Sequence, residues 1–148
     1  MSATVGVTSL TLGGFAPWGK YTAIWFTWWL GDAVGDLIVA PLLVLWLTQP
    51  FPKVSVRRIF EAIGLLLSII FVSYLMFQLG TPASSEYAMV LPLLWAAFRF
   101  GPRGVVTAAC TVSAIALAGT LNGVGAFAHV DPNASLLHLQ SFMGTMAV

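Results

Sequence analysis

The sequence predicts an all-α fold, a polytopic bundle of transmembrane helices with about four to five crossings. Composition is the first reason: 59% of the 148 residues are hydrophobic and only 7% are charged, against about 25% charged residues in an ordinary soluble domain. The second is that the apolar residues form long segments, separated by short links containing Pro, Gly and charged side chains. We therefore expect an integral membrane protein whose main partner is the lipid bilayer.

We treat residues 1–148 as one domain with no output domain. Helices are expected at 22–47, 58–79, 87–100, 105–121 and 136–148. The last of these rises only about 20 Å, less than a hydrocarbon core of about 30 Å, so we expect it to be incomplete and the chain to be a fragment.

Two of these segments have special features. The segment 87–100 is short and contains Pro92, so it either crosses as a short span or re-enters without crossing. The segment 105–121 is rich in Ala, Ser, Thr and Gly. Small side chains let several helices approach at once, which predicts a position at the centre of the bundle.

Basic residues predict the orientation. They concentrate in two links, as Lys53, Arg57 and Arg58 in the first and as Arg99 and Arg103 in the second. Because Lys and Arg near span ends favour the cytoplasm, both links are predicted to lie on the cytoplasmic side. This requires 87–100 to cross fully, and it directs the end of the chain towards the cytoplasm.

Two carboxylates stand inside the helix at 22–47. Asp32 and Asp36 share one face of a helix, and Gly31 and Gly35 form a parallel row that lets another helix approach closely. Acidic residues in a span normally face the bundle interior or a water-filled cavity. The pair is therefore a candidate sensing site that could bind a cation, accept a ligand's amine or relay a proton. The alternative is that each acid makes a polar contact with a neighbouring helix.

Other residues of this helix and of the second basic link complete the candidate set. Trp28 and Trp29 are expected at a membrane interface, and Pro41 is expected to kink the helix. Arg99 and Arg103 bracket a turn at Gly101, where they are expected to anchor the topology. Gripping a lipid phosphate, or passing motion to an output domain, is the alternative for these two arginines.

The sequence does not favour nucleic-acid binding, metal or cofactor binding, or catalysis. The basic residues form no basic aromatic surface, so nucleic-acid binding is not expected. Cys110 is the single cysteine, which leaves no disulfide framework. His129, Asp131 and His138 match no standard metal-site spacing, so neither a metal nor a cofactor is expected. No catalytic constellation is visible, and we do not expect an enzyme.

Four stretches resemble a known family in the right order along the chain. They are the APW of 16–18, the WWLGD-x-x-G-D-x-x-x-x-P of 28–41, the LLWAAFRFGPRG of 93–104 and the GTLNGVGAFA of 119–128. They resemble the MASE1 domain, a bacterial integral membrane sensor module, and they match only its C-terminal half. The matching residues are Trp28, Trp29, Gly31, Asp32, Pro41, Arg99, Phe100, Gly101 and Arg103. Asp36 is added on physical grounds.

The resemblance implies a sensory input module in the bacterial inner membrane. In full-length relatives it implies a cytoplasmic histidine kinase, diguanylate cyclase or phosphodiesterase output domain, and it implies no defined ligand. A homodimer is left open. The alternative function is a transporter or channel fragment in which the acids couple substrate movement to protons or ions. A third alternative is a non-functional fragment.

Overall fold

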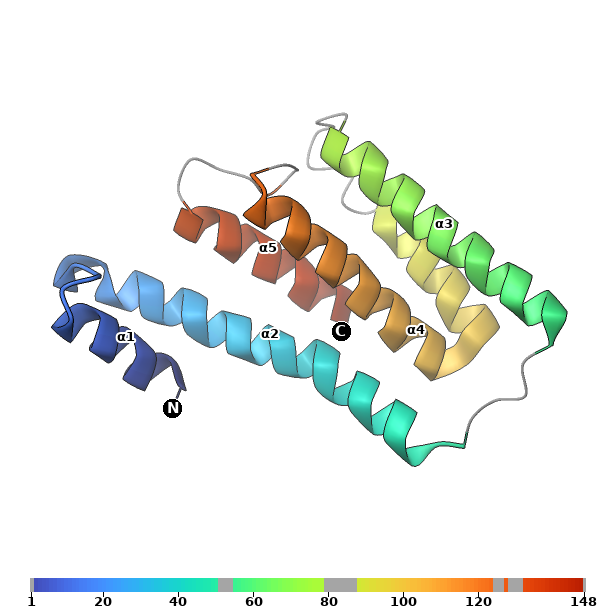
Figure 1. The fold of residues 1–148 in the computed structure, drawn as a ribbon, viewed down its shortest axis with the longest axis horizontal. Coiled ribbons are helices and arrows are strands. Elements are labelled where there is room, and N and C mark those ends of the chain that lie inside the picture. The colour runs from blue at the N-terminus through green and yellow to red at the C-terminus, as the bar shows by residue number, and fades with distance from the viewer. Residues whose placement is uncertain (1, 51–54, 79–87, 124–126, 128–131, 148) are drawn as a thin grey trace.

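The computed structural model describes residues 2–50, 55–78, 88–123, 127 and 132–147, and all regular elements in these ranges are helical. In chain order they are α1 (Ser2–Leu12), the 3₁₀ turn η1 (Trp18–Lys20), α2 (Tyr21–Thr48), α3 (Val56–Gln78), α4 (Val90–Leu121) and α5 (Pro132–Ala147) (Figure 1). The predicted all-α fold is confirmed. Among the described residues, three helical segments are long and apolar enough to cross a membrane, by length and composition alone: Trp18–Thr48, Val56–Leu75 and Val90–Leu121, the last of which reverses direction at Gly101.

The helix α4 consists of two arms joined by a sharp reversal. Gly101 has φ 66° and ψ −161° inside this helix, a backbone conformation that is essentially restricted to glycine. Pro102 then begins the second arm, where its missing N–H is not needed for a helical hydrogen bond. The first arm, 90–100, rises about 16 Å beside α3, and the second arm returns through the bundle (Figure 1). The structure thus confirms the predicted turn at Gly101, but its second arm starts at Pro102 rather than at residue 105.

The second arm of α4 forms the centre of the bundle. Its buried residues are Ala108, Ala109, Val112, Ser113 and Ala116. The helix α4 contacts α2, α3 and α5, as its small side chains predict. Leu65 and Ile69 of α3, together with Leu139 and Phe142 of α5, complete the same core.

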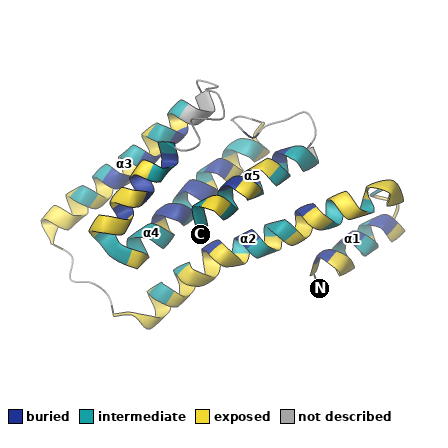
Figure 2. Cartoon of the chain, turned by 180° about the vertical axis from the view of Figure 1, so that it is seen from behind, coloured by how far each residue is buried: buried dark blue, intermediate teal, exposed yellow. Residues whose placement is uncertain are grey.

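The outer faces of α2 and α3 are exposed (Figure 2) and, apart from two acids of α2, most of their large side chains are apolar. In α3, for example, Phe60 is 70% exposed and Phe71 is 61% exposed. Such extended apolar surface is unfavourable in water, at about 25 cal/mol per Å². It suits the hydrocarbon of a bilayer, which agrees with the predicted lipid surroundings.

The short helix α1 packs against the first half of α2. The Trp25 indole N–H donates a hydrogen bond to the Thr4 hydroxyl at 3.0 Å. A Cβ atom at Gly6 would lie 2.8 Å from the Trp28 ring, so only glycine fits beneath that ring without a shift. The ring of Trp28 therefore packs on α1.

Candidate functional site

The acid pair lies on the outside of α2. Thr27, Val34 and Ile38 form the buried stripe of this helix, and helical spacing sets Asp32 and Asp36 roughly on the opposite side. Both acids are exposed. The expectation that they face the bundle interior is therefore wrong in this structure. The physical reason is that the packed stripe, with its apolar side chains, occupies the face of α2 turned to the bundle.

Glycine spacing correctly predicts one close helix approach. A Cβ atom at Gly31 would lie 2.8 Å from the Gln140 side-chain nitrogen of α5, whereas a Cβ atom at Gly35 would meet nothing within 4 Å. The Gln140 Oε1 atom is buried and has no hydrogen-bond partner among the described residues. The polar group at this contact is thus an α5 amide, which the sequence analysis missed. Its only sequence signal is a Gln inside an apolar helix.

A second polar contact joins α2 to α5 near their other ends. The Thr27 hydroxyl oxygen lies 3.0 Å from the Ala23 carbonyl oxygen and 2.7 Å from the Asn133 side-chain oxygen. One hydroxyl proton can serve only one of these acceptors. Turning the Asn133 amide so that its NH₂ group donates to Thr27 satisfies both contacts. This contact fixes the start of α5 against α2.

The two candidate tryptophans do not join the acids in a common pocket. Trp28 packs on α1, as described above. Trp29 stacks on Trp25 with ring centroids 6.4 Å apart and stays 47% exposed. Pro41 is exposed as well, and α2 continues through it as one helix. The candidates from the first half of the chain therefore remain separate features of α2.

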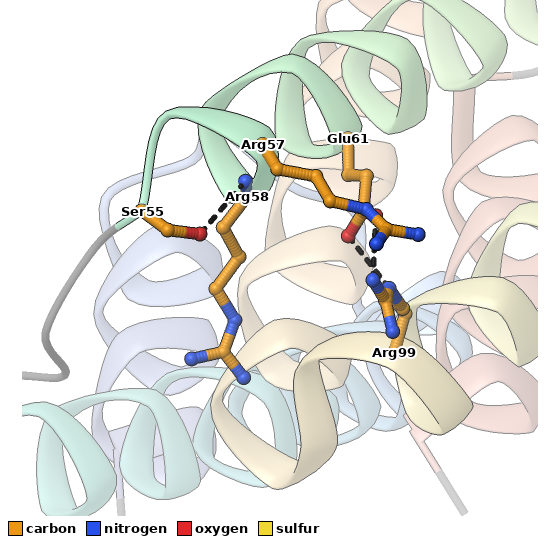
Figure 3. Close-up of polar contacts among 5 residues, drawn as sticks. All are labelled: Ser55, Arg57, Arg58, Glu61 and Arg99. Atoms are coloured by element: carbon orange, nitrogen blue, oxygen red, sulfur yellow. Dashed lines mark hydrogen bonds and ion pairs between the residues drawn. The ribbon is translucent and has the colours of Figure 1, made fainter.

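The basic links meet at one end of the bundle, here called the basic end and defined by Arg57, Arg58, Arg99 and Arg103. Figure 3 shows the first three of these arginines close together, and Arg103 lines the same cavity as Arg58. Arg99 donates two hydrogen bonds of 2.6 Å to the two carboxylate oxygens of Glu61. Arg57, one turn before Glu61, donates a third at 3.2 Å. The forked pair joins α3 to α4. It confirms that both links lie on the same side of the bundle.

Arg103 binds the C-terminal end of α2. Its guanidinium donates hydrogen bonds to the carbonyl oxygens of Leu45 at 2.9 Å, of Pro50 at 2.7 Å and of Gln49. Its central carbon lies 5.4 Å from the centroid of the Trp46 ring. The last carbonyls of a helix lack intrahelical donors and carry partial negative charge, so a cation is favourable there. The predicted topology anchor is therefore also a cap that ties α4 to α2.

A cavity of about 780 Å³ lies at the basic end, between the end of α2, the start of α3 and α4. Its walls are mostly apolar, and Arg58 and Arg103 both line it. In Figure 3 the Arg58 guanidinium points away from Glu61. Neither Asp32 nor Asp36 lines this cavity. Sequence reasoning missed it, because it is formed by three segments that are distant along the chain.

Among the described residues, no group of three or more His, Cys, Asp or Glu side chains could hold a metal ion. His138 lies exposed on α5. His129 and Asp131 lie outside the residues that the structure describes. Cys110 is half-buried in α4 as a free thiol.

Comparison with known proteins gives one family match. The MASE1 family model matches residues 1–148, the whole chain. No curated protein and no solved structure matches the chain. The family match covers the full length of the sequence rather than a single motif.

Proposed function

The chain belongs to the MASE1 family of membrane-associated sensory domains, and on that premise we propose that it is the input module of a bacterial signal-transduction receptor. The observation that carries this proposal is the family match over residues 1–148. The receptor is of the histidine kinase or cyclic-di-GMP enzyme type, and it resides in the bacterial inner membrane. The chain itself performs no catalysis in this proposal. Its output is a change in helix packing that a cytoplasmic domain reads.

The helix α5 is the element that would carry the signal. It packs against both α2 and α4, and its C-terminal end is directed towards the basic end (Figure 1). The excess of Lys and Arg assigns the basic end to the cytoplasmic side. A stimulus that favours one of two packings of α2 and α4 would shift α5 and reach the cytoplasm. The exposed acids Asp32 and Asp36 supply the contact through which a stimulus or a neighbouring helix would act.

Reporter fusions after Val148 test the orientation. We expect a green fluorescent protein to fluoresce there and alkaline phosphatase to stay inactive, because the phosphatase needs the oxidising periplasm to form its disulfides. An active phosphatase and a dark fluorescent protein would reverse the orientation. That result would remove the proposed cytoplasmic output.

A diguanylate cyclase domain fused after Val148 tests sensing. We expect Asp32→Asn to change cellular cyclic-di-GMP while the amount of membrane-inserted protein stays the same. Lys20→Gln is the control. Like Asp32→Asn it removes one exposed charge, but at the position that precedes α2 rather than within the helix. Equal cyclic-di-GMP in all three proteins would exclude Asp32 from the signalling contact.

Transport is the alternative that a second measurement separates. It requires the acids to line a path through the bundle, and the cavity at the basic end is lined by neither of them. Reconstituted vesicles should therefore show no proton or cation flux above that of empty vesicles. A flux that Asp36→Asn abolishes would favour the transporter instead.

A further inference from the structure

We propose that the cavity at the basic end binds one anionic phospholipid, with the phosphate on Arg58 and an acyl chain along the apolar wall. This goes beyond the proposed sensing function and does not depend on it. The cavity volume of about 780 Å³ falls within the range of about 300–1,000 Å³ that is typical of ligand pockets. Basic pockets between membrane helices on the cytoplasmic side are known to bind anionic lipid headgroups.

The residues around the cavity carry a net positive charge, which favours an anionic ligand. All Lys and Arg residues of the chain except Lys20 fall at 53–58 and 99–103, whereas residues 41–78 and 90–121, which surround them, contain a single acid, Glu61. Both oxygens of Glu61 already accept from Arg99, and one also accepts from Arg57. The basic end therefore carries a clear excess of positive charge, and its complement is an anion.

Arg58 is the arginine that this anion would meet. Arg57 and Arg99 bind Glu61, and Arg103 binds the carbonyls at the end of α2. Within the described ranges, the Arg58 guanidinium has no carboxylate at ion-pair distance, and it points away from Glu61 (Figure 3). Because it lines the cavity, a phosphate bound to it would sit at the cavity mouth.

The apolar wall of the cavity favours a ligand that also has an acyl chain. Ile59, Ile63 and Leu66 line the cavity and are each 47% exposed. They recur at helical spacing, so they form one stripe that starts directly beside Arg58 on α3. Ala108 and Thr111 of α4 form a wall of small side chains in the same cavity. Positive charge at the membrane surface followed by an apolar channel matches the two parts of a phospholipid.

Rival occupants fit less well. Two copies related by a two-fold axis along the membrane normal would bring their basic ends to the same depth. The like charges would then repel across the contact. An apolar helix of another protein would fill the channel but would leave Arg58 without an anion. An anionic phospholipid meets both requirements at once.

The test is native mass spectrometry of the purified chain in detergent, titrated with phosphatidylglycerol or phosphatidylcholine carrying the same acyl chains. We expect one phosphatidylglycerol to bind about tenfold more tightly than phosphatidylcholine. Both lipids present a phosphate to Arg58, but the quaternary ammonium of phosphatidylcholine cancels its net charge and is repelled by the basic end. Arg58→Gln should remove this preference. Arg57→Gln is the matched control, because it removes the same charge one residue away and does not line the cavity. It should change phosphatidylglycerol affinity less than about twofold, as expected for a screened surface charge.

A second variant tests the channel without changing charge. Ala62 is exposed and lines the cavity, so Ala62→Phe should fill the channel and weaken phosphatidylglycerol binding while the helical circular dichroism stays unchanged. Equal losses in Arg57→Gln and Arg58→Gln would show diffuse surface charge and overturn the site. Displacement of the lipid by soluble glycerol phosphate would show that the site takes a free phosphate ester, which would also overturn the proposal. Neither readout involves signalling, so the sensing proposal stands or fails separately.

Discussion

Replacing Arg103 with Gln tests how the bundle is held together at its basic end. The wild-type guanidinium spans from α4 to the carbonyls of Leu45, Gln49 and Pro50 and lies over the Trp46 ring. Glutamine is shorter and neutral, so it cannot reach these partners as a fork. The substitution therefore removes the cap of α2 and a link between α2 and α4 in one step.

The size of the loss follows from the surroundings of each contact. The Leu45 carbonyl belongs to a half-buried residue, and a hydrogen bond to a charged donor contributes about 1.5–3 kcal/mol there. Gln49 and Pro50 are exposed, so water replaces the donor at little cost. The guanidinium over Trp46 adds about 0.5–1 kcal/mol. We expect Arg103→Gln to lower the free energy of unfolding by about 2–4 kcal/mol.

Unfolding by sodium dodecyl sulfate in mixed micelles, followed by far-ultraviolet circular dichroism, measures this loss where the transition is two-state. Arg103→Lys should give an intermediate loss, because it keeps the charge without the fork. Arg57→Gln serves as the control, since the Arg57 side chain is 83% exposed. A free energy of unfolding for Arg103→Gln within about 0.5 kcal/mol of wild type, the usual range of surface substitutions, would refute the capping role.

Three further predictions use the same unfolding measurement. Gly101→Ala should lower the free energy of unfolding by about 1–3 kcal/mol, because φ of 66° with ψ of −161° is strained for any residue with a side chain. An unchanged unfolding midpoint would mean that the reversal does not need glycine. Gly31→Ala should destabilise the bundle more than Gly35→Ala, because only the first Cβ atom meets the Gln140 side chain; equal effects would contradict the close approach of α5. Thr27→Val should cost about 0.6 kcal/mol and at most about 1.7 kcal/mol, the mean and the maximum measured for hydrogen bonds between membrane helices. A neutral result would show that the Asn133 contact adds no stability.

Local chemistry explains why the sequence predicts the helices and their order. Apolar length predicts a span, and the pair Gly101–Pro102 predicts a break because only glycine adopts the required φ and proline starts the next arm. Small side chains predict a central position for 105–121, since they permit close packing on several sides. The concentration of Lys and Arg in two links predicts that these links share one side of the membrane.

Contacts between distant segments could not be predicted in the same way. The pair of Arg99 and Glu61 joins residues 38 apart, and Arg103 reaches carbonyls more than 50 residues earlier in the chain. Neither contact has a sequence pattern, because each depends on the placement of two helix ends. The cavity at the basic end depends on the same placement.

The sequence by itself determined a membrane-embedded helical bundle of the MASE1 family, with its helices in order and its basic links on one side. Only the tertiary structure decided which face of each helix is buried. The helix α2 is apolar around most of its circumference, so periodicity could not show that Asp32 and Asp36 lie outside. In a membrane, apolar side chains are equally acceptable towards lipid and towards other helices, and close packing therefore sets the rotation of each helix.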